Sequence, residues 1–118
     1  MLAHWGRDRA RGPKLPLELL VKRQTSETAD FFGLTDRGRL APGLRADVNL
    51  IDFDALRLHK PELVHDMPAN GRRFIQRVDG YETTLVAGTP IFERVQHTGA
   101  LPGRLVRAGR SGEAVKAA

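Results

Sequence analysis

Four histidines are the residues best able to hold a metal ion, and their spacing does not bring them together. His4, His59, His65 and His97 form no H-x-H or H-E-x-x-H pair, the patterns in which neighbouring imidazoles converge on one metal. Pro61 interrupts the stretch between His59 and His65, so no shared face is predicted for them. The chain has no cysteine, which excludes thiolate zinc sites and a cysteine nucleophile within it. We therefore predict no metal ligand in these residues.

Nucleophilic and acid–base catalysis also lack their usual motifs. There is no G-x-S-x-G, and Ser26 is predicted to cap a helix while Ser111 lies close to the end. Asp47 and Asp52 flank one predicted strand, whose two-residue period sends their side chains to opposite faces. The glycine-rich loops that bind phosphate are missing too. The sequence predicts no catalytic residue.

Positive charge is the remaining chemical signal. The formal net charge is +5, and fifteen of the nineteen basic residues are arginine. They are spread along the chain, with small clusters at 7–11 and 104–110, and among the seven aromatic residues only Trp5 lies within such a cluster. Nucleic-acid binding favours cations on one face, with aromatic platforms between them for single strands. This pattern therefore argues against a nucleic-acid partner. It favours a solvated arginine-rich surface.

The length and composition indicate a small globular unit. A chain of 118 residues allows a single domain or a piece of a larger one, and 41% apolar and 28% charged residues are ordinary globular values. No apolar run approaches the roughly 20 residues that span a bilayer. The first residues contain no apolar signal segment, so we expect a cytoplasmic protein with no membrane partner.

Helices are predicted in the first third. Residues 1–15 read as a loop, followed by a helix over 16–24, where Pro16 suits the first turn. A second helix runs over 26–32, capped by a Thr25 or Ser26 hydroxyl and closed by a left-handed Gly33. We expect its apolar side chains to face inward: Ala29, Phe31 and Phe32.

Short antiparallel strands are predicted after residue 34, which makes the fold class α+β. The first strand covers 46–53, after a turn at Pro42-Gly43. Residues 54–72 read as irregular, and a second strand covers 73–78. A hairpin follows with its tight turn at Gly88-Thr89 and its strands over 82–87 and 90–95.

One stretch resembles the point at which metal-dependent amidohydrolases leave their catalytic barrel and enter a small β-sandwich. The pattern there is G-x-hydrophobic-x-x-G-x-hydrophobic-x-P-G-x-x-A-D, followed by an apolar strand and an acidic turn. This chain reads GLTDRGRLAPGLRADVNLID over residues 33–52. The flanking sequences HWGRDR and GPKLPLE, over residues 4–18, are similar to the segment after the eighth barrel strand in N-acyl-D-amino-acid deacylases.

The resemblance covers residues 4–107, with two departures. The closing hairpin of the family leads into an Asp-Gly turn, where this chain has Glu93-Arg94-Val95-Gln96-His97. The metal-binding histidines and the catalytic aspartate of the family lie upstream of the matched segment, and no residue here corresponds to them.

The resemblance implies the C-terminal portion of an N-acyl-D-amino-acid deacylase (D-aminoacylase). Residues 1–33 would be a barrel-derived loop and the last two helices of a (β/α)8 barrel. Residues 34–107 would be an antiparallel β-sandwich-like segment, incomplete alone, and 108–118 a flexible tail. In the complete enzyme a zinc ion would activate water for amide hydrolysis. This portion would be inactive without the barrel that binds the metal.

The loop after the last barrel strand would border the active site. The resemblance thus makes three residues candidates for facing a small N-acyl amino acid: His4, Arg7 and Arg9. A local ion pair with Asp8 is the alternative role for either arginine. Unpaired strand edges and an uncovered helix face predict docking onto the missing barrel or self-association.

Two other functions stay open from the sequence. The chain could be a stand-alone interaction or scaffold domain that reuses the sandwich. The weaker alternative is a basic nucleic-acid-binding module.

Overall fold

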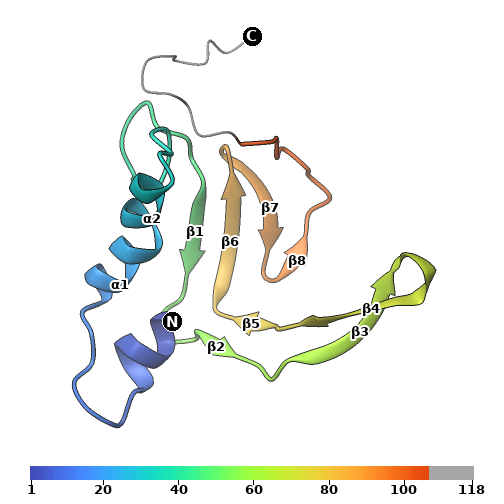
Figure 1. The fold of residues 1–118 in the computed structure, drawn as a ribbon, viewed down its shortest axis with the longest axis horizontal. Helices are drawn as coiled ribbons and strands as arrows, with labels where there is room; N and C mark the ends of the chain where they lie inside the picture. The colour runs from blue at the N-terminus through green and yellow to red at the C-terminus, as the bar shows by residue number, and fades with distance from the viewer. Residues whose placement is uncertain (107–118) are drawn as a thin grey trace.

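The computed structural model describes residues 1–106 of the chain. Two short helices precede a four-stranded antiparallel sheet and two two-stranded ribbons (Figure 1), so the predicted α+β class is confirmed. The predicted flexible tail over 108–118 lies outside the described residues, as do Arg107, Arg110 and Ser111.

The N-terminal segment is not the plain loop that the sequence predicted. His4–Asp8 form a π-helical turn, in which the N–H of Arg9 donates to the carbonyl of His4 at 2.8 Å. The N–H of Leu15 donates to the carbonyl of Trp5 at 2.9 Å and closes the segment. We call residues 4–15 the N-terminal loop. Its turn is held by contacts to residues more than 40 positions away, which local spacing does not reveal.

The first helix is confirmed and the capping of the second is not. Helix α1 spans Leu17–Gln24 directly after Pro16, and its Leu20 is buried at 1% exposure. Helix α2 spans Ser26–Phe31 without a side-chain cap. The Thr25 hydroxyl instead donates to the carbonyl of Val21 at 2.8 Å. Helix α1 ends at Gln24, one residue before Thr25. The free carbonyls of its last turn therefore compete for the Thr25 hydroxyl, which was expected to cap α2.

Helix α2 buries only part of its predicted inner face. Ala29 is 4% exposed, whereas Phe31 and Phe32 are 83% and 59% exposed, so their predicted inward orientation is wrong. The helix is closed by Gly33, whose φ of +66° confirms the predicted left-handed end. Ala29 lies very close to Gly38: a Cβ added to Gly38 would be only 2.6 Å from the Cβ of Ala29. Ala29 thus packs against the Gly38 turn, while the rings of Phe31 and Phe32 meet edge to face with centroids 5.1 Å apart.

The sheet has the order β1-β6-β7-β8 (Figure 1). Strand β1 spans Val48–Ile51, two residues shorter than predicted at each end, and pairs with β6 (Tyr81–Val86). The predicted hairpin is confirmed as β6 and β7 (Thr89–Glu93), although its turn residues are Ala87-Gly88. Strand β8 (Gln96–His97), which the sequence did not predict, extends the sheet past β7.

Two ribbons replace the irregular stretch predicted over 54–72. Strand β2 (Arg57–Leu58) pairs with β5 (Val78–Asp79), and β3 (Glu62–Met67) pairs with β4 (Gly71–Ile75). The predicted strand over 73–78 is therefore split between β4 and β5. Prolines just before β3 and just after it hid this strand, because they occupy its ends rather than its interior. We call residues 62–75 the β3–β4 arm, which extends away from the four-stranded sheet (Figure 1).

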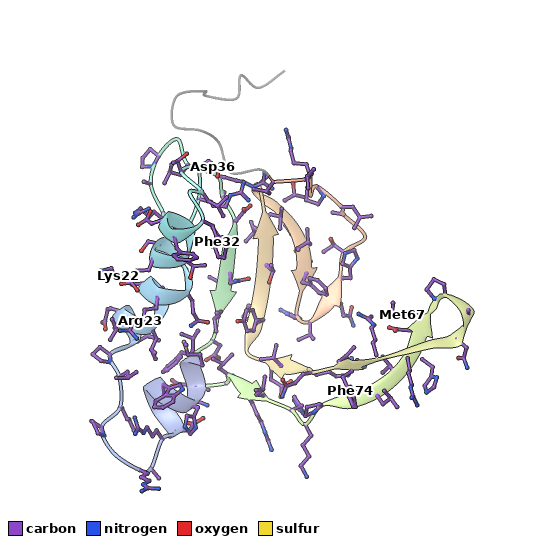
Figure 2. The ribbon with its side chains drawn as sticks, viewed as in Figure 1. Lys22, Arg23, Phe32, Asp36, Met67 and Phe74 are labelled. Atoms are coloured by element: carbon purple, nitrogen blue, oxygen red, sulfur yellow. The ribbon has the colours of Figure 1, made fainter. Side chains whose placement is uncertain are left out.

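Very little of the chain is enclosed. Among the described residues only Leu20, Ala29 and Leu56 are buried apolar side chains. The chain exposes 9847 Å², whereas a folded monomer of 13.1 kDa exposes about 6,400 Å². The excess is larger than the roughly 1,900 Å² that twelve residues can expose even when unfolded. Figure 2 shows Phe74 on the arm, where it is 75% exposed. The elements thus surround no core of ordinary size.

Candidate functional site

Arg7 connects the N-terminal loop to the turn between β1 and β2. Its Nη1 donates to the carbonyls of Phe53 and Asp54, the latter at 2.9 Å, and its Nη2 donates to the carbonyl of Leu56 at 2.6 Å. Its Nε and Nη2 also donate to the carboxylate of Asp8 at 2.7 and 3.1 Å. These contacts engage all five N–H groups of the guanidinium. Arg7 therefore has no N–H left over for a substrate carboxylate.

The ion pair with Asp8, which was the alternative expected from the sequence, is present. The hydrogen bond to Asp8 raises the pKa of Arg7 above its ordinary value. The hydrogen bond from Arg7 in turn lowers the pKa of Asp8. Both groups therefore keep their charges at neutral pH. The Asp8 carboxylate balances the charge of the Arg7 guanidinium beside the carbonyls that Arg7 binds.

His4 and Arg9 both contact Trp5. The rings of His4 and Trp5 meet edge to face with centroids 5.3 Å apart, and the Arg9 guanidinium lies 4.5 Å from the centre of the Trp5 ring. Arg9 also donates to the carbonyls of Arg11 and Pro13, the latter at 3.3 Å. The structure records two donor groups of Arg9 in these bonds, so the guanidinium can still meet an anion. We call His4, Trp5 and Arg9 the Trp5 cluster.

The three predicted substrate-facing residues thus divide into two sets. His4 and Arg9 share the Trp5 cluster, and Arg7 turns towards the β1–β2 turn instead. Sequence reasoning did not single out Trp5 as the platform for Arg9. Their separation by four positions in a helical turn is the signal that could have found it.

The most densely bonded carboxylate belongs to the sequence signature itself. Asp47 accepts the N–H of Ala87 at 2.8 Å, the Nε of Arg45 at 2.8 Å and the Nη1 of Arg37 at 3.2 Å. Burial works to raise the pKa of Asp47, but these hydrogen bonds and cations outweigh it, so the pKa lies below its ordinary value. We call Asp47, Arg37, Arg45 and the Ala87 amide the Asp47 cluster. It joins the entry of β1 to the turn between β6 and β7, and its role is structural.

Three other titratable side chains named in the sequence, those of His59, His97 and Asp52, also have local partners. The Nε2 of His59 lies 2.7 Å from a carboxylate oxygen of Asp79, and the Nδ1 of His97 accepts the N–H of Gly99 at 3.0 Å. Asp52 accepts the N–H groups of Asp54 and Ala55, at 3.0 and 3.1 Å, within the β1–β2 turn. Within residues 1–106, no group of three or more such side chains could hold a metal ion. The described residues therefore do not fit a metal centre.

Two open grooves are present among the described residues. One, of about 680 Å³, is lined by Leu50, Glu82, Thr83, Glu93, Arg94 and Gln96 on the sheet. The other, of about 640 Å³, lies between the helices and β1 and includes Val21, Leu40, Val48 and Tyr81. Neither contains a member of the Trp5 cluster. These two grooves therefore do not include the candidate substrate residues of the N-terminal loop.

Much of the positive charge is neutralised locally. In the described part of the chain, ion pairs join seven arginines to carboxylates: Arg7, Arg23, Arg37, Arg39, Arg45, Arg73 and Arg77. A phosphate backbone would have to compete with these carboxylates, which weakens the electrostatic case for nucleic acid.

Comparison with known proteins identifies the family. A model of the family described as "Amidohydrolase family" matches residues 1–92, more than three quarters of the chain. The chain belongs to the amidohydrolase family. The match includes the N-terminal loop, both helices and the signature at Asp47, the segments in which the sequence resemblance was found. This family is generally metal-dependent, although residues 1–106 hold no metal site.

Curated relatives give the type of amidohydrolase. The chain is 34% identical to a D-aminoacylase from Alcaligenes xylosoxydans xylosoxydans over 106 residues, or 90% of this chain and 19% of that protein. It is 36% identical to an N-acyl-D-glutamate deacylase of the same organism over 79% of this chain and 17% of that protein. An allantoinase from Deinococcus radiodurans is 32% identical over 79% of this chain and 20% of its own length. Within the family, the chain is thus similar to D-aminoacylase-type deacylases and to an allantoinase, and it spans about a fifth of the length of these relatives.

No solved structure matches this chain. Among the described residues, no helix is both long and apolar enough to cross a membrane.

Proposed function

We propose that these residues form the non-catalytic C-terminal portion of an amidohydrolase that removes the acyl group from N-acyl-D-amino acids. The observation that carries the proposal is the similarity to two deacylases of this type, combined with a described chain that offers no metal-binding group. The metal, which we propose to be zinc, and the residue that moves protons would belong to parts of the enzyme outside this chain. The chain alone would be inactive.

The division of the chain follows from the same proposal. Residues 1–33 would be the last loop and helices of a (β/α)8 barrel, and 34–107 a β segment packed beside it. The N-terminal loop would border the substrate pocket, because loops that follow barrel strands lie at the active-site mouth. Of the three candidates, His4 and Arg9 are best placed to face the substrate carboxylate, since Arg7 is fully engaged elsewhere.

The exposed apolar surface supports a chain that docks onto a larger partner. The total surface exceeds that of a folded monomer by about 3,400 Å², of which at least about 1,500 Å² cannot come from the last twelve residues; a segment leaves such an excess open when its packing partner is absent. The same observation favours our second candidate, a stand-alone interaction domain that uses this surface for another protein or for a second copy. A cytoplasmic location stays a prediction.

A chimeric enzyme tests the proposal. Residues 1–106 replace the matching segment of the Alcaligenes D-aminoacylase, and hydrolysis of N-acetyl-D-amino acids is measured with zinc present. We expect turnover by the chimera, none by the 118-residue chain alone, and none by the relative with that segment deleted. The L-enantiomers serve as a substrate control.

Two results would overturn the proposal. One is hydrolysis or stoichiometric zinc retention by the chain alone. The other is failure of the chain to restore activity both in the chimera and when it is mixed with the separately produced remainder of the relative. A monomeric chain in sedimentation at micromolar concentration, well folded and indifferent to that remainder, would count against both candidate functions.

A further inference from the structure

The N-terminal loop and the β segment meet at one side chain. The Arg7 guanidinium is the group that reaches from the loop to three carbonyls of the β1–β2 turn. Its plane also lies 5.5 Å from the centre of the Phe53 ring. The Arg7 guanidinium is thus surrounded by three carbonyls and one ring, all from residues after position 50.

We propose that Arg7 is a positioning residue through which the β segment sets the orientation of the Trp5 cluster for substrate binding. The inference rests on the proposed function, because that function places the loop at the pocket. It gives the β segment a part in substrate recognition although it supplies no catalytic group.

Both ends of the connection are held rigidly. On the loop side, Arg7 sits in the same π-helical turn as His4 and Trp5, which the Arg9-to-His4 and Leu15-to-Trp5 backbone bonds close. A displacement of Arg7 therefore carries His4 and Trp5 with it. The guanidinium of Arg9 follows, because it is stacked on the Trp5 ring.

On the β side, the turn presents its carbonyls in a defined arrangement. The Asp52 carboxylate accepts the N–H groups of Asp54 and Ala55, and the N–H of Asp52 donates to the carbonyl of Gly80 at 2.8 Å. Leu56, whose carbonyl accepts from Arg7, is one of the three buried apolar residues of the described chain. The carbonyls that Arg7 binds are thus fixed to β6 and to the small core.

The geometry requires the planar fork of arginine. Five N–H groups of fixed direction serve three carbonyls and one carboxylate at once, whereas the ammonium of lysine has three donors around one atom. Close packing supports the same contact, because a Cβ on Gly6 would lie 3.2 Å from Leu20 and 3.5 Å from Phe53. Neither Lys nor a smaller residue can replace Arg7 without releasing part of the loop.

The test uses the chimera described above and measures KM and kcat for N-acetyl-D-amino acids. Because the contact positions binding groups, we expect Arg7→Ala to raise KM about ten-fold or more while kcat changes less than about three-fold. Arg7→Lys should recover only part of the loss. Arg73→Ala, which removes a bidentate arginine from the β3–β4 arm, is the matched control and should leave KM within about two-fold.

A variant on the other side of the contact separates positioning from direct binding. Asp52→Ala frees the β1–β2 turn without touching the loop, so a positioning role predicts a rise in KM of about three-fold or more. Amide hydrogen exchange in the isolated chain should also speed up over residues 4–15 in both the Arg7→Ala and Asp52→Ala variants. If Arg7 bound substrate directly, Asp52→Ala would leave KM unchanged, and that result overturns the inference.

The failures of the two proposals are distinguishable. A parent chain that restores activity neither in the chimera nor when mixed with the remainder of the relative contradicts the proposed function, whereas an active parent whose KM is unaffected by Arg7→Ala contradicts only the positioning role. If Arg7→Ala does not fold in the chimera, Asp52→Ala and the exchange measurement on the isolated chain still decide between the outcomes.

Discussion

The Asp47 cluster and the β3–β4 arm contain the same kinds of residues and hold the chain in different ways. In the Asp47 cluster, one carboxylate joins three segments, because it accepts from Arg37, from Arg45 and from the backbone of Ala87. In the arm, Asp66 pairs with Arg73 across a single hairpin at 2.7 Å. The first set of bonds connects distant parts of the chain, and the second stays within one ribbon.

Exposure follows the same division. The guanidinium-bearing side chains of Arg37 and Arg45 are 19% and 15% exposed, whereas that of Arg73 is 55% exposed. Ion pairs near solvent contribute little to stability, and partly buried charges leave a penalty when a partner is removed. The comparison predicts that the Asp47 cluster contributes more to the stability of the chain than the ion pair of the arm does.

The largest effect is expected where the β1–β2 turn approaches β6. Gly80 has a φ of +90°, and a Cβ there would lie 2.7 Å from the Leu56 Cα and 2.8 Å from the Asp52 carbonyl oxygen. Gly80→Ala should therefore lower the free energy of unfolding by about 3 kcal/mol or more. Gly88→Ala is the control, since Gly88 also has a positive φ but has open space around it, and it should cost about 1 kcal/mol. Similar losses in urea unfolding of the two variants would contradict the close approach.

Asp47→Ala tests the cluster directly. It removes the acceptor of the Arg45 guanidinium and of the Ala87 N–H, and one of the two carboxylates that Arg37 binds, so we expect a loss of about 2 kcal/mol. The matched change in the arm, Asp66→Ala, should leave the free energy of unfolding nearly unchanged, because this ion pair is exposed to solvent. Equal effects in thermal unfolding would mean that the arm is as firmly integrated as the cluster.

Acid should weaken the Asp47 cluster as Asp47 and Asp36, a second carboxylate paired with Arg37, are protonated. The hydrogen bond from Arg37 is the largest influence on Asp36 and lowers its pKa, and the pKa of Asp47 is lowered as well. Such groups contribute their full stability above the unfolded pKa of about 3.9 and lose it as the pH falls through their folded pKa. We expect the melting temperature to fall from pH 5 to pH 3, and to fall less in Asp47→Asn. A wild-type melting temperature that rises over that interval would contradict this.

A gain of stability is expected at the turn between β7 and β8. Arg94 and Val95 have φ values of +44° and +69°, a conformation that disfavours a β-branched residue. Val95→Gly should raise the free energy of unfolding by about 1 kcal/mol, because relief of the left-handed strain exceeds the entropic cost of glycine. Val95→Ala keeps a Cβ and should give a smaller gain. Urea midpoints that place alanine above glycine would refute the assignment of strain.

The smallest change in stability is expected on the β3–β4 arm. Phe74 is 75% exposed, so Phe74→Ser should alter the free energy of unfolding by less than about 0.5 kcal/mol. If the arm is a docking surface, the same variant should weaken self-association, or association with the remainder of the enzyme, in sedimentation. Phe31→Ser, at 83% exposure on α2, is the control for a phenylalanine elsewhere. Weakening by Phe31→Ser alone would move the docking surface to the helices.

Local patterns predicted those elements whose signals lie close together in the chain. The apolar spacing around Leu20 predicted α1, Gly33 predicted the end of α2, and a glycine-containing turn predicted the β6–β7 hairpin. Strand β3 was missed, and β4 only partly predicted, because polar residues interrupt β3 and a proline lies at each of its ends, which removes the alternation that identifies a strand. The exposure of Phe31 was missed because a helix can be apolar without having an element to pack against.

The candidate site shows the same limit. His4, Arg7 and Arg9 could be named from a resemblance, but their separation into two sets depends on where distant groups lie. Trp5 is four residues from Arg9 and is a local partner, whereas the carbonyls that bind Arg7 belong to a turn some 46 to 49 residues later. Backbone carbonyls carry no residue-specific signal, so sequence could not distinguish an arginine that binds them from one that awaits a substrate.

The amino-acid sequence by itself determined the family of this protein and the identity of its short-range elements. Turn residues, helix periodicity and the signature around Asp47 each involve only a few neighbouring positions. They can therefore be recognised from the sequence alone. Tertiary structure alone decided that Arg7 is an internal connection, that Asp47 joins three segments and that the arm stands free. Those outcomes depend on which groups come into contact after the chain has folded. A hydrogen bond or a buried surface requires two partners, so neither partner's local sequence reveals it.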